Sequence, residues 1–127
     1  MRLLTSRQAR ELDHISMVDM GILGQSLMGN AGKCISNRAR TLISDINNPL
    51  ILILCGKGNN GGDGFAAASE LYHHKYIVHI HSIIREEEIK GDSLQFYNHC
   101  KSLKLPMTFG LVVPNICLLY TSDAADE

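Results

Sequence analysis

The stretch that decides the fold is Leu50-Ile-Leu-Ile-Leu-Cys-Gly-Lys-Gly-Asn-Asn-Gly-Gly-Asp-Gly64. Its first part, Leu50 to Cys55, is apolar at every position, which is typical of a central parallel strand covered by helices on both faces. A glycine loop from Gly56 to Gly64 follows, and a helix is predicted from about Gly62 to His74. A strand, a glycine loop and a helix in this order indicate one unit of a parallel α/β fold.

The segments on either side extend this pattern. We predict two helices upstream, and a strand, a helix and the start of a third strand downstream, over residues 6–20, 25–45, 76–83, 93–103 and 106–113. The alternation predicts a parallel sheet with helices packed on it, an α/β layer sandwich. Thr5 and Gln8 have the spacing of a capping box, so they mark the start of the first helix.

The helix over residues 25–45 carries apolar side chains at the helical period, so we expect one stripe of it to face the core. This stripe consists of Leu27, Met28, Ala31, Ile35, Ala39, Leu42, Ile43 and Ile46. Pro49 ends the helix because a proline biases the preceding residue away from the helical region.

Composition and charge exclude several classes of protein. Of the 127 residues, 45% are hydrophobic and 20% are charged, which rules out disordered and fibrous proteins. The net charge of -1 gives no general attraction to nucleic acid or to anionic membranes, so we expect neither as a partner. The sequence has no apolar run of a membrane span's length and no secretory signal at its start, so we expect a cytoplasmic location.

Two groups of side chains are interpreted as structural. The four cysteines are Cys34, Cys55, Cys100 and Cys117. They lie in apolar sequence without CxxC spacing, so we expect buried, reduced thiols rather than disulfides. His79 and His81 share one face of a predicted strand, but without a third ligand we favour core or surface histidines over a metal pair.

The glycine loop is where chemistry is expected. Ligands of open α/β sheets bind beyond the carboxyl ends of the strands, and glycines allow the backbone to approach them closely. Gly56, Gly58 and Gly61 satisfy the dinucleotide fingerprint, but the second strand has no acidic residue at its end to bind ribose hydroxyls. A phosphate-binding P-loop is disfavoured because no Lys-Ser/Thr pair follows Gly61.

Asn59, Asn60 and Asp63 add oxygen-bearing side chains to this loop. Such oxygens suit a cation or the hydroxyl groups of a ligand. In the alternative interpretation Asp63 caps its helix and the two asparagines adopt left-handed turn geometry. The residues alone leave both interpretations open.

Longer motifs carry a resemblance to a known family. The residues from Gly56 to Ala68 resemble the signature of the NAD(P)H-hydrate epimerases, the YjeF N-terminal domain family. Upstream, Leu4-Thr5-x-x-Gln8-x-x-Glu11-Leu12-Asp13 and Leu27-Met28-Gly29-Asn30-Ala31-Gly32 are similar to the family's opening segments. Downstream, Lys90-Gly91-Asp92 and Leu105-Pro106 fit the same pattern. The resemblance covers about residues 3–107.

The resemblance implies a Rossmann-like three-layer αβα sandwich, usually a homodimer. It also implies an isomerase that interconverts the R and S hydrates of NADH and NADPH, so that a dehydratase can repair them. Asn59, Asn60, Gly61, Gly62 and Asp63 would contact the hydrated cofactor. Asn60 would ligate a potassium ion, one per subunit, with further ligands that this sequence lacks.

Two alternatives remain open for the function. The chain could be the first half of a bifunctional epimerase and dehydratase. It could instead be a non-catalytic scaffold of the same fold that associates with RNA, against which the intact Asn59–Asp63 motif and the near-neutral charge argue.

The sequence also departs from the family pattern. Gly29 stands where the family usually has glutamate. The family's later motifs, including its proposed catalytic aspartate, have no match, so the catalytic residues are expected beyond residue 116 and the fragment is expected to be inactive alone. Residues 117–127 resemble a translated sequencing adapter, so we expect residues 1–116 to be a partial domain followed by a non-native tail.

Overall fold

The computed structural model describes residues 5, 7, 8, 11 and 24–115. Along the chain it contains α2 (Gly24–Leu42), β1 (Leu50–Cys55), α3 (Asn59–His73), β2 (Ile77–Ser82), the 3-10 helix η1 (Glu86–Glu88), α4 (Asp92–Ser102) and β3 (Met107–Phe109). Most of the predicted helix over residues 6–20 and the predicted tail over residues 117–127 lie outside the described residues. The capping box is confirmed, because the Thr5 amide donates to Gln8 Oε1 and the Gln8 amide donates to Thr5 Oγ1.

The three strands form a parallel sheet in the order β1-β2-β3, which confirms the predicted α/β fold. In this register Leu50 lies beside Ile77, and Ile80 beside Met107. Because the strands are parallel, their carboxyl ends meet at one edge of the sheet, where the glycine loop begins.

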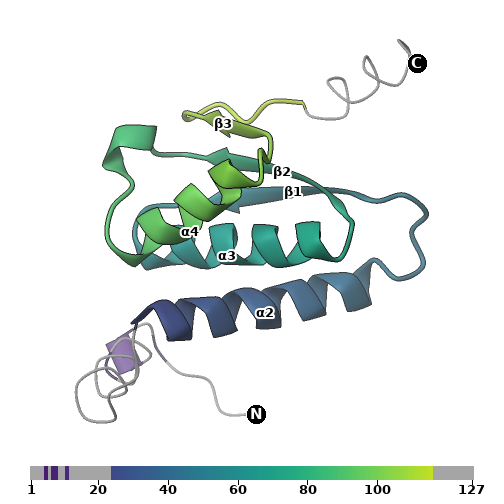
Figure 1. Cartoon of the computed structure of the whole chain (residues 1–127), viewed down its shortest axis with the longest axis horizontal. Coiled ribbons are helices and arrows are strands. Elements are labelled where there is room, and N and C mark those ends of the chain that lie inside the picture. Colours follow the sequence, from purple (N-terminus) through teal and green to yellow (C-terminus); the bar gives the residue numbers. More distant parts are fainter. Residues whose placement is uncertain (1–4, 6, 9–10, 12–23, 116–127) are drawn as a thin grey trace.

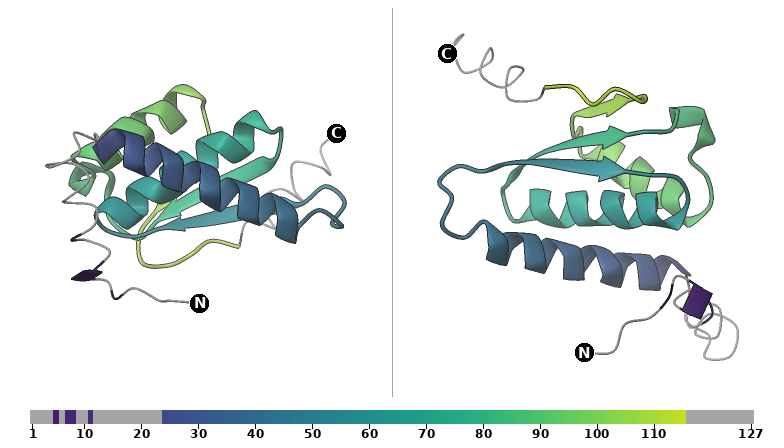
Figure 2. Two further views of the ribbon diagram at one scale, coloured as in Figure 1. Left: turned by 90° about the horizontal axis from the view of Figure 1, so that it is seen from below. Right: turned by 180° about the vertical axis from the view of Figure 1, so that it is seen from behind.

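The helices α2, α3 and α4 lie on the same side of the sheet (Figure 1, Figure 2). α3 packs on β1 and β2, and α2 lies on α3 farther from the strands. The core between the sheet and the helices includes Phe65, Leu71, Ile80 and Tyr97. Of the three expected layers, residues 24–115 therefore form the sheet and one helical layer. None of the helices in this range is both long and apolar enough to cross a membrane.

The buried face of α2 differs from the predicted stripe. Met28, Gly32 and Ser36 are its buried residues, whereas Ile35 and Leu42 are exposed. The cause is close packing: a β-carbon on Gly32 would lie 2.5 Å from the β-carbon of Ala66. Small residues let α2 approach α3 here, so Ile35 and Leu42 are turned away from the contact while Met28 stays buried in it. Ile46, which follows α2, is also exposed.

The cysteines are only partly as predicted. Cys55 and Cys100 are buried free thiols, and burial is the main cause that raises the pKa of each to about 12. Cys34 is a free thiol as well, but it is exposed because it lies off the buried face of α2. Cys117 lies outside the described residues.

Candidate functional site

The glycine loop makes a very tight turn from strand to helix. β1 ends at Cys55 and α3 already begins at Asn59, earlier than the predicted start near Gly62. Gly58 is the N-cap residue and has φ 75°, ψ -150°, a conformation open to glycine but strained for other residues. No side chain within residues 24–115 forms a cap hydrogen bond there. The motif's asparagines therefore lie in the first helical turn instead of in a loop.

Three glycines of the motif permit close packing around this turn. A β-carbon on Gly61 would lie 2.2 Å from the carbonyl oxygen of Gly56. On Gly62 it would lie 2.3 Å from Met28 Sδ, and on Gly64 2.6 Å from Cys55 Sγ. The start of α3 thus lies against its own loop, against α2 and against β1. At Gly61 the contact is with backbone, so only glycine fits there, whereas at Gly62 and Gly64 a larger residue would displace the side chains of Met28 and Cys55.

The carbonyl oxygen of Gly58 anchors the loop to two helices. The Gly61 and Gly62 amides donate to it over 3.1 and 3.3 Å. Ser93, in the first turn of α4, donates its hydroxyl to the same oxygen over 2.9 Å. Ser93 was missed in the sequence, although its place directly after the Lys90-Gly91-Asp92 motif was the available signal. The link makes the start of α4 part of the site's framework.

The predicted site residues lie together at the start of α3. Asn59 and Asn60 are exposed in its first turn, and Asp63 is half-buried in the next. Gly61 and Gly62 are buried, and their amides serve the Gly58 carbonyl. Their contact with a cofactor stays a prediction.

The alternative interpretation of these side chains does not hold. Among the described residues, the non-glycine positions with positive φ are Asn48, Lys75 and Lys104, so Asn59 and Asn60 are not left-handed. Asp63 lies inside α3, beyond the N-cap at Gly58, so it does not cap this helix. The helix therefore sets the positions of these polar side chains, and their role in a site stays a prediction.

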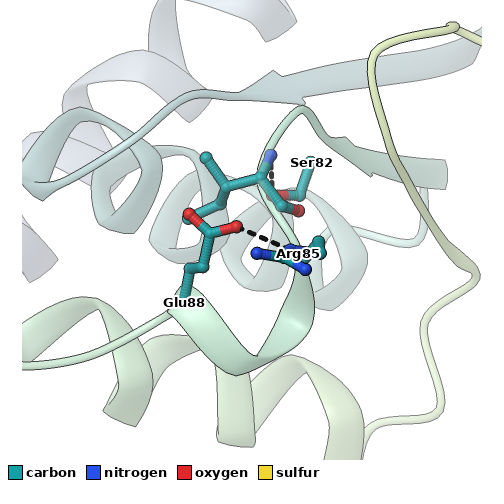
Figure 3. A network of polar contacts seen from close by, with 4 residues as sticks. Ser82, Arg85 and Glu88 are labelled. Atoms are coloured by element: carbon teal, nitrogen blue, oxygen red, sulfur yellow. Dashed lines mark hydrogen bonds and ion pairs between the residues drawn. The ribbon is translucent and has the colours of Figure 1, made fainter.

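Charged residues follow β2 at the same edge of the sheet. Ser82 ends the strand, and its hydroxyl donates to the Ile84 carbonyl over 3.2 Å. Arg85 Nε then pairs with Glu88 Oε1 over 3.0 Å in the exposed helix η1 (Figure 3). Hydrogen bonds from Arg85, and more weakly the charge of Lys57, lower the pKa of Glu88. Lys57 of the glycine loop is thus close enough to this charged rim to act on it.

The donor chemistry of the loop suits a hard cation. Amide and carboxylate oxygens are the ligands that hard cations prefer. Residues 24–115 contain no group of three His, Cys, Asp or Glu side chains that could hold a metal ion. Any cation at this loop would therefore depend on asparagine and backbone oxygens and on further ligands.

His79 and His81 are buried in β2, as the preferred interpretation predicted. Their ring nitrogens bond to Thr108 and to the backbone of Gly110, with no cluster of metal ligands around them in the described part of the chain.

Comparison with known proteins gives consistent matches. Residues 24–112 match the family described as "YjeF-related protein N-terminus". A bifunctional NAD(P)H-hydrate repair enzyme of Moorella thermoacetica is 34% identical over 99% of this chain and 25% of its own length. An NAD(P)H-hydrate epimerase of Rhodopirellula baltica is 38% identical over 71% of this chain and 36% of its own length.

A solved structure of a yeast protein has a similar fold. It superposes with a TM-score of 0.75 at 23% sequence identity, over 86% of this chain and 47% of that one. The chain thus spans less than half of that protein and about a quarter to a third of the two curated relatives above.

Proposed function

The chain belongs to the YjeF-related protein N-terminus family, and on this premise we propose that it forms part of an NAD(P)H-hydrate epimerase. The reaction is the interconversion of the R and S hydrates of NADH and NADPH in cofactor repair. Relatives from Rhodopirellula baltica and Lentilactobacillus buchneri that bear the name of this activity support the proposal. Because the chain spans only part of each, we infer that residues outside this sequence complete the site.

One observation carries the proposal most directly. The helix α3 starts at the carboxyl end of β1 with Asn59 and Asn60 exposed in its first turn. This is where open α/β sheets bind ligands, and the positive end of a helix favours the phosphate groups of a nucleotide. The hydrogen bond from Ser93 to Gly58 ties this start to α4, which supports a preorganised polar site.

The chemistry of the hydrate defines what such a site must do. Its C6 carries both a hydroxyl group and the ring nitrogen. Departure of the protonated hydroxyl as water leaves an iminium, and water adding to the other face, with loss of a proton, inverts C6. Ring opening and reclosure is the other route, and both need a general acid and a general base. We assign Asn59 and Asn60 to holding the ligand's polar groups, and we expect the acid and base beyond residue 116.

We further propose that Asn60 ligates a potassium ion, one per subunit. Its amide oxygen is a hard ligand of the kind that such a cation prefers. The carboxylate of Asp63 lies three residues further along the same helix. A bound cation would supply positive charge next to the ligand. The remaining ligands would come from outside residues 24–115.

The partners follow from the same proposal. A stereospecific dehydratase acts on the same hydrates, either as a separate protein or fused to this one. The bifunctional relative from Moorella thermoacetica favours the fused arrangement as a second candidate. We propose a cytoplasmic homodimer with no nucleic-acid or membrane partner.

Replacing Asn60 tests the proposal. In the full-length protein, Asn60→Ala should lose most of the epimerase activity and its response to potassium while keeping the parent's thermal melt. Asn98→Ala is the matched control, because Asn98 is an exposed asparagine on α4, outside the loop. An Asn60→Ala protein that epimerises the hydrates at the parent rate would show that this loop is not the site.

A further inference from the structure

Ser93 lies where α2, α3 and α4 meet at the start of α3. Its side chain is buried, with 5% of the residue exposed. A β-carbon on Gly62 would lie 2.5 Å from Met28 Cε of α2 and 2.6 Å from Ser93 Oγ of α4. The first turn of α3 is therefore enclosed by one side chain from each neighbouring helix, and the side chain from α4 carries a hydroxyl group.

The hydroxyl of Ser93 acts on the backbone of this turn. The carbonyl oxygen of Gly58 can only accept, so Ser93 is the donor of the 2.9 Å hydrogen bond between them. The Gly61 and Gly62 amides donate to the same oxygen and close the first turn of α3. The Gly58 carbonyl is thus held by two donors of its own helix and by one donor of another helix.

The peptide between Gly58 and Asn59 transmits this restraint to the asparagines. In a planar trans peptide the carbonyl and the N–H point in opposite directions, and no peptide bond of the described residues is cis. A carbonyl fixed on the Ser93 hydroxyl therefore turns the N–H of Asn59 away from α4. Gly58, at φ 75°, has a backbone that leaves this peptide free to rotate unless other groups hold it.

The helix α4 can serve as an anchor because further contacts fix its own position. Cys100 Sγ donates to the Phe65 carbonyl of α3 over 3.1 Å. The hydroxyl of Tyr97 donates to the Glu86 carboxylate after β2, and its ring packs edge-on against Phe65. Both Tyr97 and Cys100 are buried. Ser93 therefore reaches Gly58 from a helix that is itself held on α3 and on the segment after β2.

We propose that Ser93 is a positioning residue of the candidate site. Its hydroxyl fixes the Gly58–Asn59 peptide, and through it the first turn of α3, in the orientation in which Asn59 and Asn60 hold the ligand. Ser93 acts through the backbone of Gly58 and not by contact with the ligand. The identity of the ligand rests on the proposed epimerase function, whereas the restraint on the turn belongs to the fold.

Loss of the hydroxyl should weaken ligand binding more than it slows the chemical step. Asn59 and Asn60 are assigned to holding the ligand, while the acid and the base are expected beyond residue 116. In the full-length protein, Ser93→Ala should raise KM for the hydrates about 3- to 10-fold, the equivalent of one lost hydrogen bond, and leave kcat within about twofold. A loss of stability alone would not change the KM of the folded enzyme.

Ser69→Ala is the matched control. Ser69 is 6% exposed, and its hydroxyl donates to the Ala66 carbonyl over 2.9 Å. Burial, donor, acceptor and bond length thus closely match those of Ser93, but this bond lies within α3, beyond its first turn. The two variants should lower the melting temperature by similar amounts, and Ser69→Ala should keep the KM of the parent.

Hydrogen exchange tests the restraint without the use of activity. Opening of the first turn of α3 breaks the bond from Ser93, so Ser93→Ala should lower the protection of the Gly61 and Gly62 amides about 3- to 10-fold more than Ser69→Ala does. Equal protection of these amides in the two variants, or a KM of Ser93→Ala within about twofold of the parent's, overturns the proposal. A parent protein without epimerase activity refutes the proposed function instead, and exchange alone then decides whether Ser93 holds the turn.

Discussion

Substituting Gly61 by alanine perturbs the candidate site at its tightest contact. The new β-carbon would lie 2.2 Å from the carbonyl oxygen of Gly56 and 3.3 Å from its carbonyl carbon. Carbon–oxygen contacts in proteins are about 3.3–3.6 Å at closest, so the two backbone segments must separate by about 1 Å. Neither can yield as a flexible side chain would, because one segment ends β1 and the other begins α3.

The size of the effect follows from this displacement. Overpacking of this kind costs about 1–3 kcal/mol, and the better helix propensity of alanine returns up to about 1 kcal/mol. We therefore expect the free energy of unfolding to fall by about 1–2 kcal/mol. A displacement near 1 Å at a reacting site can lower the rate about 100-fold, so we expect kcat/KM to fall by about 100-fold in a protein that still folds.

Two assays on the full-length protein separate these effects. Urea unfolding gives the stability, and interconversion of the R and S hydrates gives kcat/KM. Gly29→Ala is the control, because its β-carbon would meet Phe96 at an ordinary 3.6 Å. A Gly61→Ala protein with the parent's stability and the parent's kcat/KM would refute the reasoning about this contact.

The other predictions concern α2 and the thiols. Gly32→Ala should lower the free energy of unfolding by about 1–2 kcal/mol in urea titrations, since its β-carbon meets the backbone of α3 at 2.8 Å. Gly29→Ala should raise the free energy of unfolding by about 0.5–1 kcal/mol. Equal effects of the two variants would contradict the close packing of α2 on α3. Ser36→Ala should leave the free energy of unfolding unchanged or raise it by about 1 kcal/mol, because the buried hydroxyl has no hydrogen-bond partner among the described residues. A clear fall in the free energy of unfolding would reveal such a partner. In the native protein at pH 8, a thiol reagent should label exposed Cys34 quickly and Cys100 only on unfolding. The reason is that burial raises the pKa of Cys100 to about 12. Rapid labelling of Cys100 would contradict its burial.

The strands and their order along the chain could be predicted from the sequence because their signals are local, but β3 spans only Met107–Phe109 of the predicted residues 106–113. Leu50 to Cys55 is apolar throughout, and the structure begins and ends β1 at these residues. The start of α3 was misplaced because several glycines in a row disfavour a helix by propensity. Contacts of Gly61, Gly62 and Gly64 with other elements override that preference, and such contacts are invisible in a local pattern.

The orientation of α2 could not be predicted for a related reason. Hydrophobic periodicity favours the face with the largest apolar residues, whereas α2 packs through Gly32 and Ser36. Close approach of two helices rewards small residues, and periodicity gives them no weight. Of the predicted stripe, Met28 is buried and Ala39 packs against the core, whereas Ile35 and Leu42 were expected inside and are exposed.

Some residues of the candidate site could be predicted from the sequence, and the contacts between distant residues could not. The motif itself identified Asn59, Asn60 and Asp63, and the helix brings them to one end of α3. Ser93 bonds to Gly58 across 35 positions of sequence, and Thr108 joins two histidines across a strand register. Links of this kind depend on tertiary packing, so the sequence offered no way to pair them.

The rate at which R and S NADPH hydrate interconvert decides whether this protein is an epimerase. We expect the purified full-length protein to bring either pure epimer to the equilibrium mixture much faster than buffer alone, as followed by chromatography. We also expect Asn60→Ala to lose this acceleration while its melting curve stays that of the parent. If the parent protein is folded but the epimers interconvert no faster than in buffer alone, the protein is not an epimerase.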